Sequence, residues 1–462
     1  MTPLPTVPGT RGPAGSSAPR PVPPIPPFVP DGEALLSPAV AFLAVMLFLL
    51  SADLLFVPIA GVKIKFGYFA VIALWLFAPW PMLAAARAAL FAVPWWAALV
   101  LLPLGVAVAT SVSLRDSLLW CAWLAFDLFT IITVYAFLKV RRFPIGVVQA
   151  SVAGAVALIA LFGLVQFIAI YGFDNVIFSP QRHFDTWRIN GLSGWPHFLN
   201  IFAFLLLPML LIRERMSWPS RLAVVLLLMV LVHSTAKTGW VLFVALGVLI
   251  FALRRALFVR HYLWFLIPVT ALVLLLPTPS LTPGVTAPST PEKVARFAAD
   301  LNLADKSTSG TDRVLINQMG LHVWARHPWF GVGPRAYDEY VFSRFDRELP
   351  GVNKFDGNHM VNAKSENIWI EFLAENGVLF TLGFFALLGR ALWVRRWAFA
   401  NPLHLGAWMS LVLYFGISGQ VSQTGLLTLV YAVVGIYFYA RGLRADAAPV
   451  TRMRAGDEGL RP

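Results

Sequence analysis

Apolar runs of about 20 residues recur along most of this chain, and they constrain its fold more than any other feature. A helix of that length crosses the hydrocarbon core of a bilayer, which is roughly 30 Å thick. Hydrophobic residues make up 58% of the 462 residues and charged residues only 13%, about half the charged share of a soluble domain. The runs do not alternate with a period of two, as the strands of a membrane barrel would. The sequence therefore predicts an all-α, polytopic membrane protein.

Twelve such runs are expected to form membrane-spanning helices, and the loop charges indicate their orientation. Lys and Arg gather in every second turn, for example at Arg141 and Arg395, whereas the turn "SGQVSQ" carries no charge. Cytoplasmic loops of membrane proteins carry this excess, so the net charge of +13 does not indicate a nucleic-acid partner, and both termini are expected in the cytoplasm. Lys63 and Lys65 are the main exceptions. The predicted spans are 35–52, 66–85, 90–111, 117–138, 146–171, 196–213, 219–234, 238–253, 261–277, 367–394, 402–420 and 423–440.

The regions outside the spans differ in composition. Residues 1–33 are rich in Pro, Gly and Ser, and we expect a disordered cytoplasmic tail because such a segment cannot bury a core. Residues 34–440 form the predicted transmembrane domain, and residues 441–462 form a basic cytoplasmic tail. Since Cys121 is the one cysteine, a disulfide framework or a cysteine-based metal site is excluded.

Two predicted outer loops are long enough to carry function. They are residues 172–196 and residues 278–366, and the second is expected to hold short helices of its own. A helix is predicted there from Thr311 or Asp312 until "HPWFGVGP" (327–334) stops it. By periodicity alone, a helix lying on the membrane surface and anchored by Trp324 and Trp329 is the better explanation of this stretch.

Three basic residues stand at predicted outer ends of spans: Arg188, Lys237 and Arg313. Any one of them could be a side chain that reaches the interface. Lys237 fits that explanation least, because it lies in a tight turn on the outer face, against the positive-inside trend. Phosphate or diphosphate is the natural ligand of such cations, since Arg grips it with two hydrogen bonds and Lys holds it as a point charge.

The stretch "NAKSENIWIEFLAENG" brings acids to the mouth of a predicted span. Ser365 can cap the helix and Glu366 can complement its dipole, which is the simpler explanation of both residues. Asn367, Glu371 and Glu375 follow at spacings of four and share one face. Because acids facing lipid are costly, that face should meet protein or water, and we expect it to line a cavity.

Other ionisable residues give weaker signals. Asp127 lies in the middle of an apolar run and could pair with a buried cation or line the same cavity. The histidines are scattered and lack the spacing of metal ligands, so no metal site is expected.

Four motifs, taken together and in order, resemble the O-antigen ligase and O-antigen/exopolysaccharide polymerase superfamily of bacterial envelopes. The resemblance covers about residues 150–395. Each motif is weak alone, but four in order on the predicted outer face are fairly specific. They are "RINGLSGWPHFLN" (188–200), "HSTAKTGW" (233–240), "DRVLINQMGLHVWARHPWFGVGP" (312–334) and "SENIWIEFLAENG" (365–377).

The chain departs from the family pattern at two places. The Ser-Arg pair of the family's Ser-Arg-x-Gly turn is here Ala236 and Lys237. The lysine keeps the positive charge but cannot bind an anion through two parallel hydrogen bonds, as a guanidinium does. The family's frequent His before Asn is here Glu366. Both departures leave polymerase and ligase open.

The resemblance implies a glycosyl-transfer enzyme of the bacterial inner membrane, with the 278–366 loop in the periplasm. Its donor would be a glycan on undecaprenyl diphosphate, and its acceptor a glycan or lipid hydroxyl. Arg188, Lys237 and Arg313 would stabilise the diphosphate, and Glu366 would be the base. No metal, nucleotide sugar or other cofactor is required. Membrane lipids and other polysaccharide assembly proteins are further candidate partners.

The leading hypothesis from the sequence is a polymerase of lipid-linked repeat units, and the alternative enzyme is the O-antigen ligase, with lipid A-core as acceptor. A lipid-linked glycan flippase is the alternative from another class. Such transporters usually carry an internal repeat, and none is evident in this sequence.

Overall fold

A computed structural model of the chain describes most of the predicted membrane domain. The described residues are 38–59, 62–91, 100–178, 180–183, 186–213, 215–234, 237–267, 309–348, 367–393, 401–418 and 424–443. The predicted N-terminal tail, residues 444–462 of the predicted C-terminal tail, and Glu366 lie outside these ranges.

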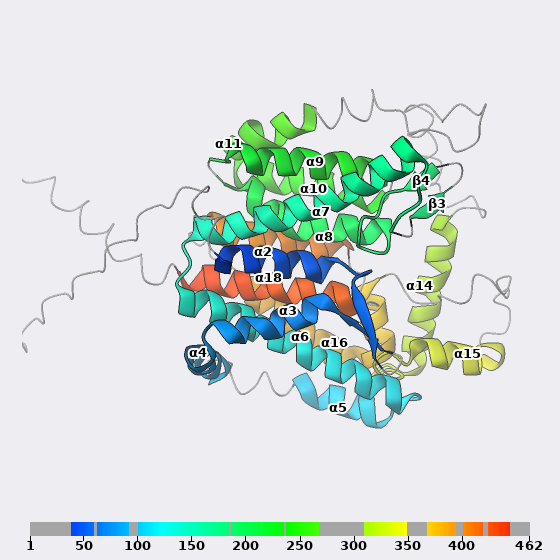
Figure 1. Cartoon of the computed structure of the whole chain (residues 1–462). Helices are drawn as coiled ribbons and strands as arrows, with labels where there is room; N and C mark the ends of the chain where they lie inside the picture. The colour runs from blue at the N-terminus through cyan, green and yellow to red at the C-terminus, as the bar shows by residue number, and fades with distance from the viewer. Residues whose placement is uncertain are drawn as a thin grey trace, which may run out of the picture.

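The described part is mostly helical, as the sequence predicts, and its long helices form one bundle (Figure 1). At its centre every residue of α8 except His197 is buried, because the helix is apolar on all sides and α7, α9, α10, α17 and α18 pack around it. The helical elements are α2 (Pro38–Ser51), α3 (Phe66–Ala73), η1 (Leu74–Phe77), α4 (Pro79–Phe91), α5 (Leu101–Ala109), α6 (Leu114–Arg141), α7 (Ile145–Phe173), α8 (Pro196–Leu211), α9 (Trp218–Ser234), α10 (Lys237–Leu253), α11 (Arg255–Leu257), η3 (Phe258–Tyr262), α14 (Ser309–Arg326), α15 (Tyr337–Glu348), α16 (Ile368–Leu392), α17 (Pro402–Leu413), η6 (Tyr414–Ser418) and α18 (Thr424–Gly442).

Three described helices are long and apolar enough to cross a membrane: α6, α7 and α16. A fourth span arises if the bent pair of α3–η1 and α4 is counted as one, and five further apolar helices have 10–17 residues. The predicted count of twelve spans therefore remains a prediction.

The predicted span over residues 66–85 is not one straight helix. The segment Phe66–Phe77 and the helix Pro79–Phe91 meet at an angle of 107°. The bend falls at Ala78 in the stretch "APWP" (78–81). A residue before a proline avoids the helical region, and Ala78 accordingly has φ −166° and ψ 70°. The second helix of the pair continues to Phe91, beyond the predicted boundary at residue 85.

Two small hairpins modify the all-α prediction. Strands β1 (Phe56–Ile59) and β2 (Val62–Lys65) pair antiparallel, with Phe56 opposite Lys65. Strands β3 (Gln181–His183) and β4 (Thr186–Arg188) pair likewise, with Gln181 opposite Arg188. The sequence predicts no strand in either segment.

The first hairpin explains one of the two exceptional lysines. The Lys65 ammonium lies 2.6 Å from Asp53 Oδ1, and both side chains are nearly buried. Burial raises the pKa of Asp53, while the neighbouring Lys65 and then Lys63 act to lower it. Lys63 itself lies over the ring of Phe56, at 4.9 Å from its centroid. One lysine thus belongs to an internal ion pair, and the other to the hairpin surface.

The hairpins, α14 and α15 all lie at one end of the bundle, whereas α4 and α11 lie towards the other end (Figure 1). With the N-terminus in the cytoplasm, the turn between the first two predicted spans (53–65) faces outward. The loops 172–196 and 278–366 are predicted on the same outer face. Their described parts thus gather on one side, as that prediction requires.

Candidate functional site

Arg188 is the last residue of strand β4, and the residues on either side of it bond to helices of the bundle. The Tyr171 hydroxyl donates to the carbonyl of Trp187 (2.8 Å), and the Ile189 N–H donates to the carbonyl of His233 (3.4 Å). The Nε of Arg188 is buried and has no hydrogen-bond partner among the described residues. Burial lowers the pKa of Arg188. A half-buried cation whose Nε is buried without a partner is stabilised by an anion that offsets its desolvation, so this end of β4 can bind one.

The loop after Arg188 is built on Gln166, which the sequence analysis did not single out. Gln166 is fully buried in α7, and its Oε1 accepts from the N–H groups of Asn190 (2.9 Å) and Gly191 (2.7 Å). Its Nε2 donates to Asn190 Oδ1 (2.7 Å) and to the carbonyl of Ile177 (2.9 Å). The signal in the sequence is a glutamine inside the apolar run "LFGLVQFIAI", since polar residues in membrane helices usually find specific partners.

Lys237 is the first residue of α10, and Asn200 of α8 fixes the turn that precedes it. The Asn200 amide donates to Ser234 Oγ (3.0 Å) on one side of the turn. On the other side Gly239 lies so close that an added Cβ would be 2.5 Å from Asn200 Oδ1. The side chain of Lys237 lies outside the described residues. Because Ile189 bonds to His233, the segments that carry Arg188 and Lys237 are joined, as the diphosphate hypothesis requires.

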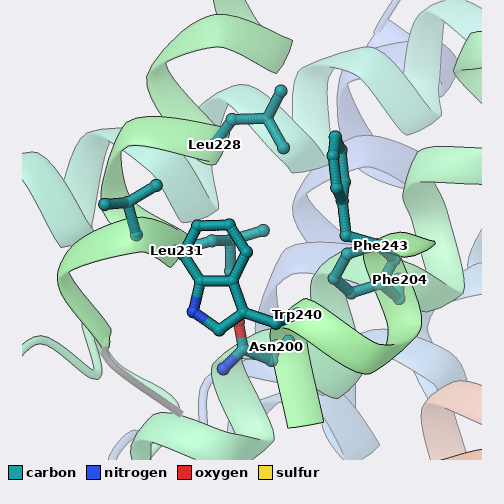
Figure 2. Close-up of a pocket in the computed structure, with 8 residues that line it drawn as sticks. Asn200, Phe204, Leu228, Leu231, Trp240 and Phe243 are labelled. Carbon is teal, nitrogen blue, oxygen red and sulfur yellow. The ribbon is translucent and has the colours of Figure 1, made fainter. Parts of the chain in front are cut away.

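A small, mostly apolar pocket lies beside this turn. Trp240 and Phe243 of α10 lie opposite Leu231 and Leu228 of α9, with Asn200 close by (Figure 2). Such a lining suits a hydrocarbon chain rather than a sugar. The full lining is Asn200, Phe204, Leu228, Leu231, Val232, Gly239, Trp240 and Phe243.

Arg313 lies in the first half of α14, and its side chain is outside the described part of the chain. The helix begins at Ser309, before the predicted cap at Thr311 or Asp312. It ends at Arg326, directly before "HPWFGVGP", as predicted. Met319 and Val323 of α14 share a buried cluster with Ala374 of α16. The helix therefore packs against protein in its second half.

Helix α16 begins at Ile368, and its cap differs from the predicted one. Asn367 is the N-cap, and its Oδ1 accepts from the N–H of Trp369 (2.9 Å). The prediction of Ser365 as the cap is therefore wrong, since Asn caps as well as Ser and stands two residues later. Glu366, the predicted base, lies just before the helix and outside the described residues.

Glu371 and Glu375 lie on a face of α16 that meets protein. Their residues are 6% and 5% exposed, and Glu375 Oε2 accepts from the N–H of Arg335 (2.8 Å). Ile368 and Phe372 of the same helix line a pocket together with Asp127. The sequence predicts that this face meets protein or water, and the described residues show protein around Glu371 and Glu375.

Buried polar atoms without partners mark the junction of α14, α15 and α16, a feature that the motifs did not reveal. Across the described ranges, Tyr337 Oη, His322 Nε2 and both side-chain amide atoms of Asn376 have no hydrogen-bond partner. Burial, and then the charges of Asp338, Glu371 and Glu375, raise the pKa of Tyr337, so it stays a donor. Unsatisfied buried groups of this kind are rare and call for a ligand or water.

Asp127 lines a second small pocket, between α6, α16, η6 and α18. The Thr428 hydroxyl donates to its Oδ1 (2.6 Å), and Oδ2 is buried without a partner in the described ranges. Asp127 forms no ion pair with a described residue. Of the two predicted roles, pairing with a buried cation or lining a cavity, the described residues therefore favour the second. The remaining lining is apolar or aromatic, apart from the hydroxyl of Tyr431.

Among the described residues, no three of His, Cys, Asp and Glu lie close enough together to hold a metal ion.

The chain matches one known family over the part that holds most of this site. Residues 222–388 match the family model described as O-antigen ligase. This match supports the assignment to the O-antigen ligase and polymerase superfamily, and it confirms the resemblance seen in the motifs. Lys237, Arg313 and Glu366 lie inside the matched range, and Arg188 precedes it. No curated protein matches the chain.

The family defines the class of function. It is associated with membrane proteins that transfer glycans as ligases or polymerases, with lipid-linked glycans and acceptors as substrates.

Proposed function

We propose that this protein polymerises undecaprenyl-diphosphate-linked oligosaccharide repeat units into exopolysaccharide or O-antigen, at the periplasmic face of the bacterial inner membrane. The observation that carries the proposal is Arg188, a half-buried residue whose buried Nε has no partner among the described residues. Its segment is joined by the Ile189–His233 bond to the turn of Lys237. This is the environment that a diphosphate needs.

The cations act on the leaving group. As the bond between the anomeric carbon and the diphosphate oxygen breaks, its electron pair stays on the diphosphate. Arg188 donates to this oxygen group, and Lys237 and Arg313 add positive charge from α10 and α14. Fixed charges in a site that excludes water need little reorganisation as the new charge develops.

The base acts on the acceptor. Glu366 takes the proton of the acceptor hydroxyl while that oxygen bonds to the anomeric carbon. The products are an extended glycan and the free lipid diphosphate. Asn367, the next residue in the sequence, caps α16.

The lipid chain of the donor has a fitting place beside the cations. The pocket lined by Phe204, Trp240 and Phe243 begins two residues after Lys237. Aromatic and aliphatic side chains suit the methyl-branched isoprene units that follow the diphosphate.

Ligation of a finished glycan to lipid A-core is the second candidate, and the match to the O-antigen ligase family favours it. The same cations and base serve either reaction, because only the acceptor differs.

Surface polysaccharide from a strain lacking the gene separates these functions. Loss of a polymerase leaves single repeat units attached to the cell surface, which is the result we expect. Loss of a ligase leaves lipid-linked polymer unattached. Repeat units held on the inner leaflet would indicate a flippase and would contradict both enzyme proposals.

A further inference from the structure

A short backbone contact ties the end of α14 to α16. Residues 328–335 and residues 374–378, which we call the glycine clamp, lie side by side and exchange backbone hydrogen bonds. These are Val332 N to Ala374 O (3.0 Å), Gly333 N to Glu375 O (2.9 Å) and Val378 N to Pro328 O (2.8 Å).

Two glycines permit this approach. Gly331 and Gly377 both have φ +70°, and an added Cβ on Gly331 would overlap the carbonyl of Glu375. An added Cβ on Gly377 would overlap the carbonyl of Trp329. Gly377 also interrupts α16, so the first turns of that helix belong to the clamp rather than to the span below.

Glu375 closes the clamp with its side chain. Its Oε2 accepts from the N–H of Arg335 (2.8 Å). Arg335 has φ 57°, a left-handed conformation that a residue with a side chain rarely adopts. The hydrogen bond from its N–H to Glu375 helps to hold this strained residue in place.

The clamp also rests on the beginning of α6. The Val112 N–H donates to the carbonyl of Val332 (3.1 Å), and the Ser117 hydroxyl donates to the carbonyl of Pro334 (2.8 Å). Gly333 lies against Ser111, where an added Cβ would overlap the serine side chain. The loop end is thus fixed to two helices of the bundle.

We propose that Glu375 is a positioning residue for the transfer reaction: through the glycine clamp it sets α14, which carries Arg313, against the first turns of α16, which follow Glu366. This rests on the proposed function of that site. Glu375 itself contacts the loop backbone and needs no contact with substrate. Its role requires an acceptor oxygen, so a glutamine can replace it and an alanine cannot.

Three variants of the full-length protein test the proposal: Glu375→Ala, Glu375→Gln and, as a matched control, Glu339→Gln on the exposed side of α15. Two readouts are measured on each in lipid vesicles. One is the backbone amide exchange of residues 331–336, and the other is the transfer rate at varied donor and acceptor concentrations.

We expect Glu375→Ala to speed exchange in this segment and to lower kcat on the order of 10- to 100-fold, because small misplacements of catalytic groups cost this much. Glu375→Gln should keep the protected amides and at least half of the parental kcat. Glu339→Gln should match the parent in both readouts.

Two results would overturn the proposal. If Glu375→Ala exchanges faster but transfers normally, the clamp does not position the site. If Glu375→Gln keeps slow exchange yet is as inactive as the alanine variant, Glu375 acts through its charge and is not a positioning residue. Should the parent show no transfer at all, the proposed function fails, while the exchange data still report on the clamp.

Discussion

The residue that carries most of the functional argument is Arg188, and only part of its role is visible in the sequence. The motif "RINGLSG" predicts a cation near a membrane surface. Its two neighbours, Trp187 and Ile189, bond to Tyr171 and His233, and local patterns do not reveal these contacts.

Replacing Arg188 by Ala should abolish most transfer while leaving the protein folded. Losing one donor to a developing anion costs roughly 2.7–4 kcal/mol, or about 10²–10³-fold in kcat. Initial rates with a lipid-diphosphate-linked donor would measure this. Lys63→Ala, a change of an exposed cation on the β1–β2 hairpin, is the control and should transfer normally. Normal transfer by Arg188→Ala would reduce Arg188 to an interfacial residue.

Glu366→Gln tests the base. The variant keeps shape and hydrogen bonding but cannot take a proton, so we expect the transfer rate to fall on the order of 10²–10⁴-fold. The measurement is the rate at saturating donor, with Glu366→His as a companion that restores part of it. A glutamine variant with the parental rate would leave Glu366 only a helix-end charge, worth about 0.3–1 kcal/mol of stability.

At the scale of elements, the apolar runs predict the helices well, and their interruptions less well. Apolar periodicity places α6, α7 and α16 within a few residues of their ends. The bend at Pro79 and the break at Gly377 follow from proline and glycine chemistry. Their geometry also depends on partners: Gly377 breaks the helix where the backbone of Trp329 approaches, and that contact spans almost fifty residues of sequence.

Gly239→Ala tests how the turn of Lys237 is positioned. The new Cβ would press on Asn200, and overpacking of this kind costs about 1–3 kcal/mol. We therefore expect a lower unfolding temperature in detergent and weaker donor binding, seen as a raised donor KM. Gly389→Ala is the matched control, since nothing lies within 4 Å of its added Cβ. Equal behaviour of the two variants would show that the Asn200 contact does not set this turn.

At the scale of the whole molecule, the alternation of charged loops predicts one outer face. The described parts of three predicted outer loops do lie at one end of the bundle (Figure 1). Which side of a membrane that end faces follows from the positive-inside rule alone.

Reporter fusions decide the topology. We expect a fusion after Ser309 to report a periplasmic location and a fusion after Ala448 a cytoplasmic one, because the basic turns lie on the opposite side from the long loop. Alkaline phosphatase and a fluorescent protein are suitable reporters. A cytoplasmic signal at Ser309 would remove Arg313 and Glu366 from the periplasmic face and with them the proposed site.

The central claim is that this protein itself joins glycan units carried on a lipid diphosphate, with Arg188 holding the leaving group. The most direct measurement uses purified protein in lipid vesicles with an undecaprenyl-diphosphate-linked repeat unit as the only glycan, and follows the length of the lipid-linked product. We expect the parent protein to produce a ladder of longer glycans and the folded Arg188→Ala variant to leave single units. Unchanged single units with the parent protein, or a parental ladder with the variant, would contradict the account.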